Sequence, residues 1–413
     1  MLTRRDLKFE GMAPPRRAAR GASGSAAFAI LCIVLAAVNL RPALTSAATM
    51  ATEIEQGLGL GSVGIGVLTT MPVLCFGLFG PFAPLLSARL GLERAMALLL
   101  MGLFAGLGLR AVPQSPALFA GTLLAGAAIG MAGVLLPVVI RRRFPGHLGS
   151  MTGLYTMVLS IGGASAAGLT PVLERAWQSW TLALAGWSVP ALVAGLLWSA
   201  LAASSAAASG TGSLPRFSLL LRDRLAWSVT AFMGLQAGLA FIVLGWLPTL
   251  LRDRGLDVLN AGAVTSVSIL AQTATALLVP SLAARRASPR LMIVLVLAAT
   301  CFGFLGLIYA PLASRLLWAL LLGLGQGGLF SLALLFVTIR APTAEVTAML
   351  SGMSQSIGYL GASLCPFAVG LLRGGHDPFA GPAIIVVTVS AACAWCGLQA
   401  AVPAHVLPHL RAG

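Results

Sequence analysis

The sequence has little charge. Only 9% of its 413 residues are Asp, Glu, Lys or Arg, whereas 58% are hydrophobic. A water-soluble protein carries about 25% charged residues, because most of its surface faces water. A chain with so few charges cannot cover such a surface, which argues against a soluble enzyme and against an extra soluble domain.

Acidic residues and lysine are the scarcest charged groups. The chain has 11 Asp and Glu against 26 Lys and Arg, and Lys8 is its only lysine. A net charge of +15 would suggest a nucleic-acid partner in a soluble protein. Here the arginines lie in short runs between apolar stretches, with no basic face interleaved with aromatic residues, so we expect no such partner. The run Arg141–Arg143 is expected to contact lipid headgroups.

Groups that commonly carry out catalysis are missing from the apolar stretches. No Asp or Glu lies deep within these stretches, and all four histidines fall in predicted loops or tails. The six cysteines include one CxxC, Cys393 with Cys396, which has no second pair and no nearby histidine. The glycine-rich segments 126–130 and 323–328 follow no predicted strand and precede no Lys-Ser or Lys-Thr, unlike phosphate loops. We therefore expect no enzymatic activity, no metal site and no cofactor.

Long apolar stretches are what the chain does have. Each spans about 20 residues, enough to cross a hydrocarbon core of roughly 30 Å. Backbone groups in lipid must pair within their own segment, so the stretches should be helices. They predict an all-α membrane protein with twelve transmembrane helices, at 25–48, 61–87, 92–111, 115–140, 149–171, 180–203, 225–251, 258–284, 289–311, 314–340, 345–372 and 380–403.

The composition changes between the sixth and seventh stretches. Residues 202–214 are rich in Ala, Ser and Gly and lead into a basic segment, as is typical of a linker. The predicted organisation is a cytoplasmic tail over 1–24, a six-helix bundle over 25–203, a cytoplasmic linker over 204–224, a second six-helix bundle over 225–403 and a cytoplasmic tail over 404–413.

The distribution of basic residues predicts the orientation. If both termini are cytoplasmic, Lys and Arg on that side outnumber those on the outer side by roughly three to one. The basic, proline-containing N-terminal stretch resembles a cytoplasmic tail more than a signal peptide. We expect a multi-pass protein of a bacterial inner membrane with both termini inside.

The two halves of the chain are related by a repeat. A gap-free shift of 196 residues places Gly59-Leu60 on Gly255-Leu256, and Ser160-Ile-Gly162 on Ser356-Ile-Gly358. The same shift places Arg94 on Arg290. Two halves in the same orientation predict two pseudo-symmetric six-helix bundles with a substrate site between them, as in transporters that work by alternating access.

Arg41 is the only charged residue deep within a predicted span. A charge at mid-membrane costs at least about 2.5–3.5 kcal/mol on insertion scales, so it usually faces a cavity and a partner. No carboxylate lies deep within a predicted span to pair with it, but an anionic or strongly electronegative substrate would suit the forked donors of a guanidinium. The alternative is that the helix starts later and Arg41 extends to the outer interface.

Uncharged polar residues lie near this arginine in the sequence and recur in stripes on other predicted helices. Thr45 shares its helical face, whereas Asn39 lies about 200° away and is expected to bond to a neighbouring helix. Stripes of Thr, Ser, Gln and Tyr on other spans suit a polar cavity; the alternative is hydrogen bonding between helices. The candidate substrate contacts are Arg41, Thr45, Asn39, Thr69, Tyr155, Gln236, Gln272, Gln326, Gln355 and Tyr359.

Several motifs carry a family resemblance. The most specific is Asn39-Leu-Arg-Pro-Ala-Leu-Thr-Ser46; others are Leu68–Val73, Leu135–Phe144, Met151–Tyr155 and Leu322–Gly328. With these motifs the chain resembles the cyanate permease and 2-nitroimidazole transporter branch of the major facilitator superfamily. The resemblance implies that fold over essentially the whole chain, and it places Arg41 where that branch keeps a buried arginine.

The sequence departs from the family in one loop. Between helices two and three the superfamily usually carries an Asp before basic residues, but Ala88 stands there, and Ala284 matches it in the second half. We therefore expect the cytoplasmic gate to rest on basic residues, with helix C-terminal carbonyls or Glu93 as partners. The candidate gating residues are Arg89, Arg94, Arg285 and Arg290.

These observations together predict a monomeric secondary transporter. Its substrate is expected to be a small anionic or cyanate- or nitro-type polar solute, anchored by Arg41. The alternative is efflux of lipophilic drugs or metabolites, which would make Arg41 dispensable and call for a wide, aromatic-lined cavity. Only three Tyr and eight Trp are present to build one.

Overall fold

The predicted helical spans are present in the computed structural model. It describes residues 16–144, 147–203, 218, 220–284, 289–342, 344–373 and 377–407. Within these ranges, twelve helical segments are long and apolar enough to cross a membrane, which confirms the predicted all-α membrane fold. The helices are α1 (Arg16–Asn39), α2 (Pro42–Thr49), α3 (Ala51–Leu58), α4 (Ser62–Phe79), η1 (Gly80–Phe82), α5 (Ala83–Leu90), α6 (Leu92–Leu109), α7 (Ser115–Arg143), α8 (Leu148–Trp177), α9 (Trp180–Ala185), α10 (Ser188–Ala203), α11 (Arg224–Asp253), α12 (Val258–Ala284), α13 (Arg290–Tyr309), η3 (Leu312–Ser314), α14 (Arg315–Ile339), α15 (Ala344–Leu372) and α16 (Ala380–Ala400).

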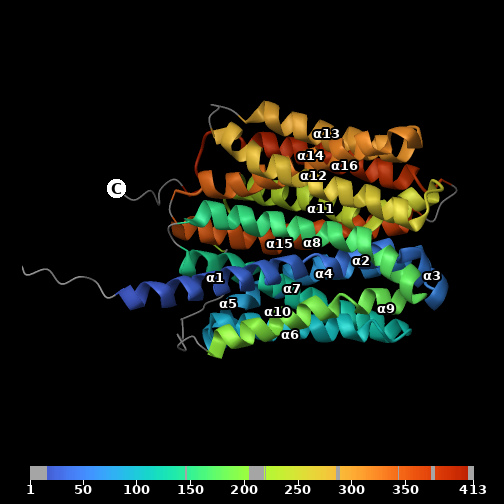
Figure 1. The fold of residues 1–413 in the computed structure, drawn as a ribbon. Helices are drawn as coiled ribbons and strands as arrows, with labels where there is room; N and C mark the ends of the chain where they lie inside the picture. The colour runs from blue at the N-terminus through green and yellow to red at the C-terminus, as the bar shows by residue number, and fades with distance from the viewer. Residues whose placement is uncertain are drawn as a thin grey trace, which may run out of the picture.

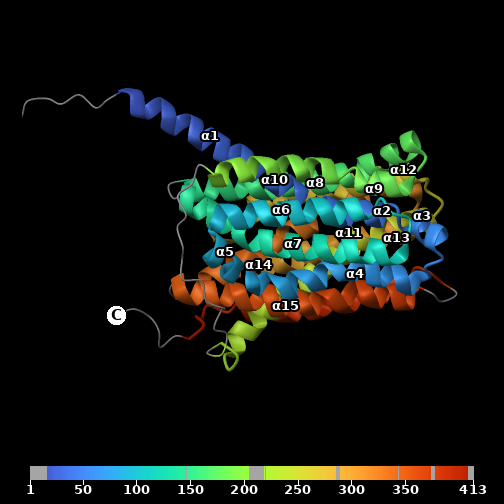
Figure 2. The ribbon, with the colours of Figure 1, turned by 90° about the horizontal axis from the view of Figure 1, so that it is seen from below.

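The long helices run alongside one another as a single bundle (Figure 1). Helices α1 to α10 form the first half and α11 to α16 the second, with most of the blue and green helices on one side of the yellow and red ones. The view turned by 90° shows α3 at one end of the bundle and α5 at the other (Figure 2). We call these the α3 end and the α5 end.

The sequence repeat reappears in the helix boundaries. Helix α4 begins at Ser62 and α12 at Val258, which differ by the same 196 residues that relate the two halves. Turns at the α3 end match as well, because Gly59 and Gly255 have φ values of 64° and 91°. That left-handed conformation strains any residue with a side chain, so each half places glycine at the same turn.

The two halves pack closely against each other. Helix α4 lies along α15, α8 lies along α12, and α2 contacts both α8 and α11. The Ser266 hydroxyl on α12 donates a 2.8 Å hydrogen bond to the Ala164 carbonyl on α8. The hydrophobic core of the second half also takes in side chains of the first half from the α3 end, including Met50, Ile54 and Ile65.

The first span is broken in the middle of the bundle. Helix α1 ends at Asn39 and α2 begins at Pro42, with Arg41 as its N-cap residue. Pro42 has no backbone N–H to continue the α1 hydrogen-bond pattern, so a break is expected here. The corresponding part of the second half, in α11, is continuous. The break places Arg41 at the junction of two helices beside α8.

Candidate functional site

Arg41 lies in the interior with unused hydrogen-bonding capacity. Its Nη1 atom is buried and donates no hydrogen bond to any residue that the structure describes. The side chain lines a small cavity together with Ser160 of α8, Gln272 of α12 and Phe330 of α14. A buried donor without a partner is costly, so a ligand that accepts from it gains affinity. The cavity has room for little more than a water molecule.

Two tyrosines flank the arginine. Tyr155 on α8 and Tyr359 on α15 both lie close to Arg41 and to each other. Both side chains are half-buried. The structure therefore brings Arg41, Tyr155 and Tyr359 together, and they come from both halves.

One glycine makes room for the arginine side chain. A Cβ atom added at Gly163 of α8 would lie 3.2 Å from Cδ and 3.3 Å from Cβ of Arg41. Few real Cβ contacts are so short, so even alanine here would push against the side chain. The tight contact fixes the direction in which Arg41 leaves the break between α1 and α2.

Two of the predicted glutamines form a connected pair. Gln272 Nε2 donates to Gln326 Oε1 at 3.2 Å, and Gln326 Nε2 donates to the Leu239 carbonyl of α11 at 3.2 Å. Gln272 also lines the cavity of Arg41. These bonds link α12, α14 and α11 beside that cavity. Of the two glutamines, Gln272 is the one that lines the cavity.

The other polar candidates near the break bond to backbone. Asn39 Nδ2 donates to the carbonyls of Leu35, at 2.7 Å, and of Pro190 on α10, at 3.2 Å, which confirms the expected bond to a neighbouring helix. The Thr45 hydroxyl donates to the Arg41 carbonyl at 3.3 Å. Thr69 bonds within α4 and lines a second small cavity, next to Phe241 of α11.

Gln236 and Gln355 are satisfied within their own helices. Gln236 Nε2 donates to the Met233 carbonyl at 3.0 Å, and Gln355 Nε2 donates to the Ser351 hydroxyl at 3.0 Å. Neither lines either of the two cavities beside Arg41 and Phe241. A substrate role for these two residues stays a prediction.

The predicted gating arginines lie at the α5 end or outside the described residues. Arg89, Arg94 and Arg290 are exposed, whereas Arg285 falls outside the part of the chain that the structure describes. Glu93, an expected partner, is instead bonded by Arg143 of α7 at 2.8 Å. Arg143 thus binds a buried carboxylate within the first half, a role that differs from the lipid contact expected for its run. A gating role of the four arginines stays a prediction.

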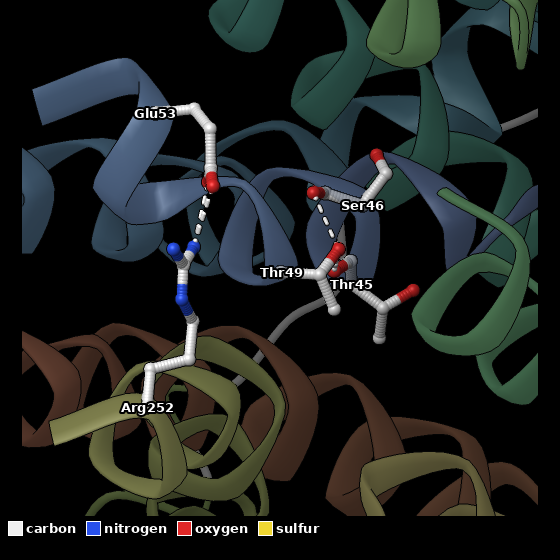
Figure 3. Close-up of polar contacts among 5 residues, drawn as sticks. All are labelled: Thr45, Ser46, Thr49, Glu53 and Arg252. Atoms are coloured by element: carbon white, nitrogen blue, oxygen red, sulfur yellow. Dashed lines mark hydrogen bonds and ion pairs between the residues drawn. The ribbon is translucent and has the colours of Figure 1, made fainter. Parts of the chain in front are cut away.

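Ion pairs join the halves at the α3 end. Arg252 at the end of α11 pairs with Glu53 of α3 at 2.8 Å, and Arg175 of α8 pairs with Asp257 at 3.4 Å. Figure 3 shows Glu53 and Arg252 facing each other across the gap between α3 and α11, with Thr45, Ser46 and Thr49 on the adjoining α2. The sequence alone did not predict this pairing.

An aromatic cluster beside Tyr359 was also missed. The rings of Phe76 on α4, Phe241 on α11 and Tyr359 on α15 have centroids 5.9 to 6.4 Å apart. A phenylalanine within an apolar span gives no signal that separates it from an ordinary core residue. The one available hint was that two of the three tyrosines of the chain lie in polar stripes.

The sequence matches a family model and several bacterial transporters. Residues 26–366 match the model of the Major Facilitator Superfamily. The chain is 35% identical to the uncharacterized transporter YycB of Bacillus subtilis (strain 168), over 86% of this chain and 89% of that one. It is 33% identical to the 2-nitroimidazole transporter of Escherichia coli (strain K12), over 89% and 94%. It is 31% identical to the cyanate transport protein CynX of the same organism, over 83% and 89%.

Solved structures share the fold at low sequence identity. The D-xylose–proton symporter matches with a TM-score of 0.72 at 14% identity, covering 93% of this chain and 98% of the symporter. The nucleoside transporter NupG matches with a TM-score of 0.70 at 17% identity, covering 91% of this chain and 98% of the transporter. The family resemblance and the twelve-span fold expected from the sequence are both confirmed.

Proposed function

The chain belongs to the major facilitator superfamily, a family of transporters and not of enzymes, and on that premise we propose that it carries a small anionic or cyanate- or nitro-type polar solute with Arg41 as the anchor. It is a multi-pass membrane protein related to bacterial transporters. The substrate would bind between the halves, which expose it to the two sides in turn.

One observation carries the proposal: a guanidinium nitrogen is buried between the halves and has no partner among the described residues. An anion or a nitro group would satisfy it, with the hydroxyls of Tyr155 and Tyr359 as further donors. Charge-assisted hydrogen bonds of this kind are about twice as strong as neutral ones. The cost of keeping Arg41 desolvated is thereby offset when the substrate binds.

Two relatives support the substrate class. One is named for the transport of cyanate and another for that of 2-nitroimidazole. Cyanate is a small anion, and 2-nitroimidazole presents the two oxygens of a nitro group. Both chemistries suit the fork of an arginine, so Arg41 accounts for substrates that otherwise share little.

We further propose the orientation of the molecule. With both termini cytoplasmic in a bacterial inner membrane, the α5 end faces the cytoplasm and the α3 end faces outward. The exposed Arg89, Arg94 and Arg290 then lie on the cytoplasmic side, as the positive-inside rule favours. Each half contributes residues to the site within one chain, so a monomer is sufficient for transport.

Counterflow in proteoliposomes tests the function. We would compare uptake of labelled cyanate and labelled 2-nitroimidazole by the wild type with uptake by Arg41→Ala and Arg41→Lys. Loss of uptake in Arg41→Ala, with partial activity in Arg41→Lys, is the expected result. Uptake unchanged in both variants would make Arg41 structural and favour efflux of lipophilic compounds instead.

A further inference from the structure

Phe76, Phe241 and Tyr359 form an aromatic triangle across the boundary between the halves. Phe76 belongs to the first half, and the other two belong to the second. The ring centroids lie 5.9 Å apart for Phe76 and Phe241, 6.4 Å for Phe76 and Tyr359, and 6.0 Å for Phe241 and Tyr359. The interplanar angles of 58°, 61° and 84° describe tilted and edge-to-face contacts, which aromatic rings favour.

The triangle adjoins the proposed anion site. Phe241 lines a small cavity with Ala43 and Leu44 of α2, which follow Arg41 by two and three residues. Thr69 of α4 and Gly245 of α11 line the same cavity. The charged anchor and the aromatic surface are therefore neighbours in the interior of the bundle.

The triangle spans the boundary along which the two halves would move during alternating access. The rings contact one another where α4 meets α11 and α15. If the halves separate during transport, Phe76 would move with the first half and leave Phe241 and Tyr359 on the second. A flat ring can enter between Phe76 and the other two rings at a smaller separation than a bulkier group can. It then contacts aromatic groups on both sides.

We propose that this triangle is the ring-binding surface of the substrate site, and that the substrate is a small planar aromatic anion or nitro compound. The inference rests on the proposed role of Arg41. The carboxylate or nitro group of the substrate binds Arg41 and the tyrosine hydroxyls, while its ring stacks on Phe76, Phe241 and Tyr359. Aliphatic acids of the same charge and similar size gain only the first set of contacts.

A competition experiment with matched acids tests this inference without any mutation. Purified wild-type protein in proteoliposomes takes up labelled benzoate by counterflow, in the presence of unlabelled benzoate, cyclohexanecarboxylate or acetate. Benzoate and cyclohexanecarboxylate have the same charge and nearly the same size, but only benzoate has an aromatic ring. Benzoate should compete about tenfold better than cyclohexanecarboxylate, as expected for one or two aromatic contacts.

Variants locate the effect on the triangle. Phe241→Leu should bring the two acids to within about twofold of each other, because the ring contact is lost. Phe336→Leu is the matched control, since Phe336 makes a comparable ring contact, 5.6 Å from Phe232, inside the second half. It should retain the preference. Phe76→Leu provides a second test from the other half if Phe241→Leu fails to fold.

The outcomes separate the two proposals. Equal competition by benzoate and cyclohexanecarboxylate in the wild type, or an unchanged preference in both Phe241→Leu and Phe76→Leu, would overturn the aromatic subsite. If cyanate uptake still required Arg41 in that case, the anion-transport proposal would stand. If Arg41→Ala retained uptake of both cyanate and benzoate, the anion-transport proposal and the aromatic subsite would both be overturned.

Discussion

Glu53 and Arg252 form an ion pair that links the two halves at the α3 end. Nη1 of Arg252 lies 2.8 Å from both carboxylate oxygens of Glu53, and each side chain is 22% exposed. Next to the pair, the hydroxyls of Ser46 and Thr249 are buried without partners among the described residues. Figure 3 shows the pair between α3 and α11, beside α2, the helix that begins directly after Arg41.

Removing this charge pair should favour opening of the α3 end. In Glu53→Gln, Arg252 keeps its charge but loses its partner, and a partly buried pair of this kind contributes about 1–3 kcal/mol. We expect Ser46→Cys, in a background without the native cysteines, to react at least about fivefold faster with a membrane-impermeant maleimide when Glu53→Gln is added.

Glu55→Gln is the matched control, because Glu55 lies on the same helix and forms no ion pair with a described residue. It should leave the labelling rate of Ser46→Cys unchanged. Reversing the pair, with Glu53→Arg and Arg252→Glu together, should restore slow labelling. Equal rates in all of these variants would show that the ion pair does not hold the α3 end closed.

The three consecutive arginines at the end of α7 should differ in their effect on stability. Arg143 bonds Glu93, whose side chain is only 9% exposed, while Arg141 and Arg142 are exposed. Arg143→Ala leaves a buried carboxylate without this partner, which costs about 2–4 kcal/mol after allowance for partial exposure. We expect a clear fall in the apparent melting temperature in detergent for Arg143→Ala but not for Arg142→Ala. Equal melting temperatures would mean that water replaces the pair.

Hydropathy and charge were enough to predict the spans and Arg41. A long apolar run has one stable form in lipid, a helix, so the twelve spans depend only on composition. Arg41 stood out because a charge inside such a run is costly. Both signals are local, and neither needs knowledge of which helices are neighbours.

The contacts between helices could not be predicted in the same way. Glu53 and Arg252 are separated by 199 residues, and each alone is an ordinary charge near the end of a span. Phe76 and Phe241 look like any other apolar residue of their helices. Gln355 was a candidate because it is polar, but its amide bonds to Ser351 one turn away, and only the conformation of the side chain decides this.

Arg110 should be needed to hold α2 in place. This fully buried side chain follows α6 and donates from Nη1 to the Ala43 carbonyl at 2.8 Å and from Nη2 to the Thr122 hydroxyl at 3.1 Å. Arg110→Ala removes both bonds and leaves a cavity, at a cost of about 2–4 kcal/mol. We expect a lower melting temperature and a higher KM for transport, because Ala43 lies two residues after Arg41.

Arg142→Ala is the control for this change, since Arg142 lies on α7, the helix that also carries Thr122, but is exposed. It should affect neither the melting temperature nor KM. If Arg110→Ala lowered the melting temperature without any change in KM, Arg110 would stabilise the bundle without positioning the substrate site.

Gly163 should control the position of the Arg41 side chain. In Gly163→Ala, the new methyl group lies 3.2 Å from Cδ and 3.3 Å from Cβ of Arg41, so the guanidinium must shift. Alanine also favours the helix over glycine by about 1 kcal/mol, so this variant should not lose stability through the backbone. We expect KM for cyanate to rise by about fivefold to tenfold, because a hydrogen bond to a charged donor weakens steeply when it is misplaced.

Gly133→Ala on α7 is the matched control, as a Cβ there meets no atom within 4 Å. An increase in KM in Gly163→Ala alone, at unchanged melting temperature, would show that the geometry of Arg41 sets the affinity. Equal KM values in the two variants would mean that the substrate does not depend on where this guanidinium lies.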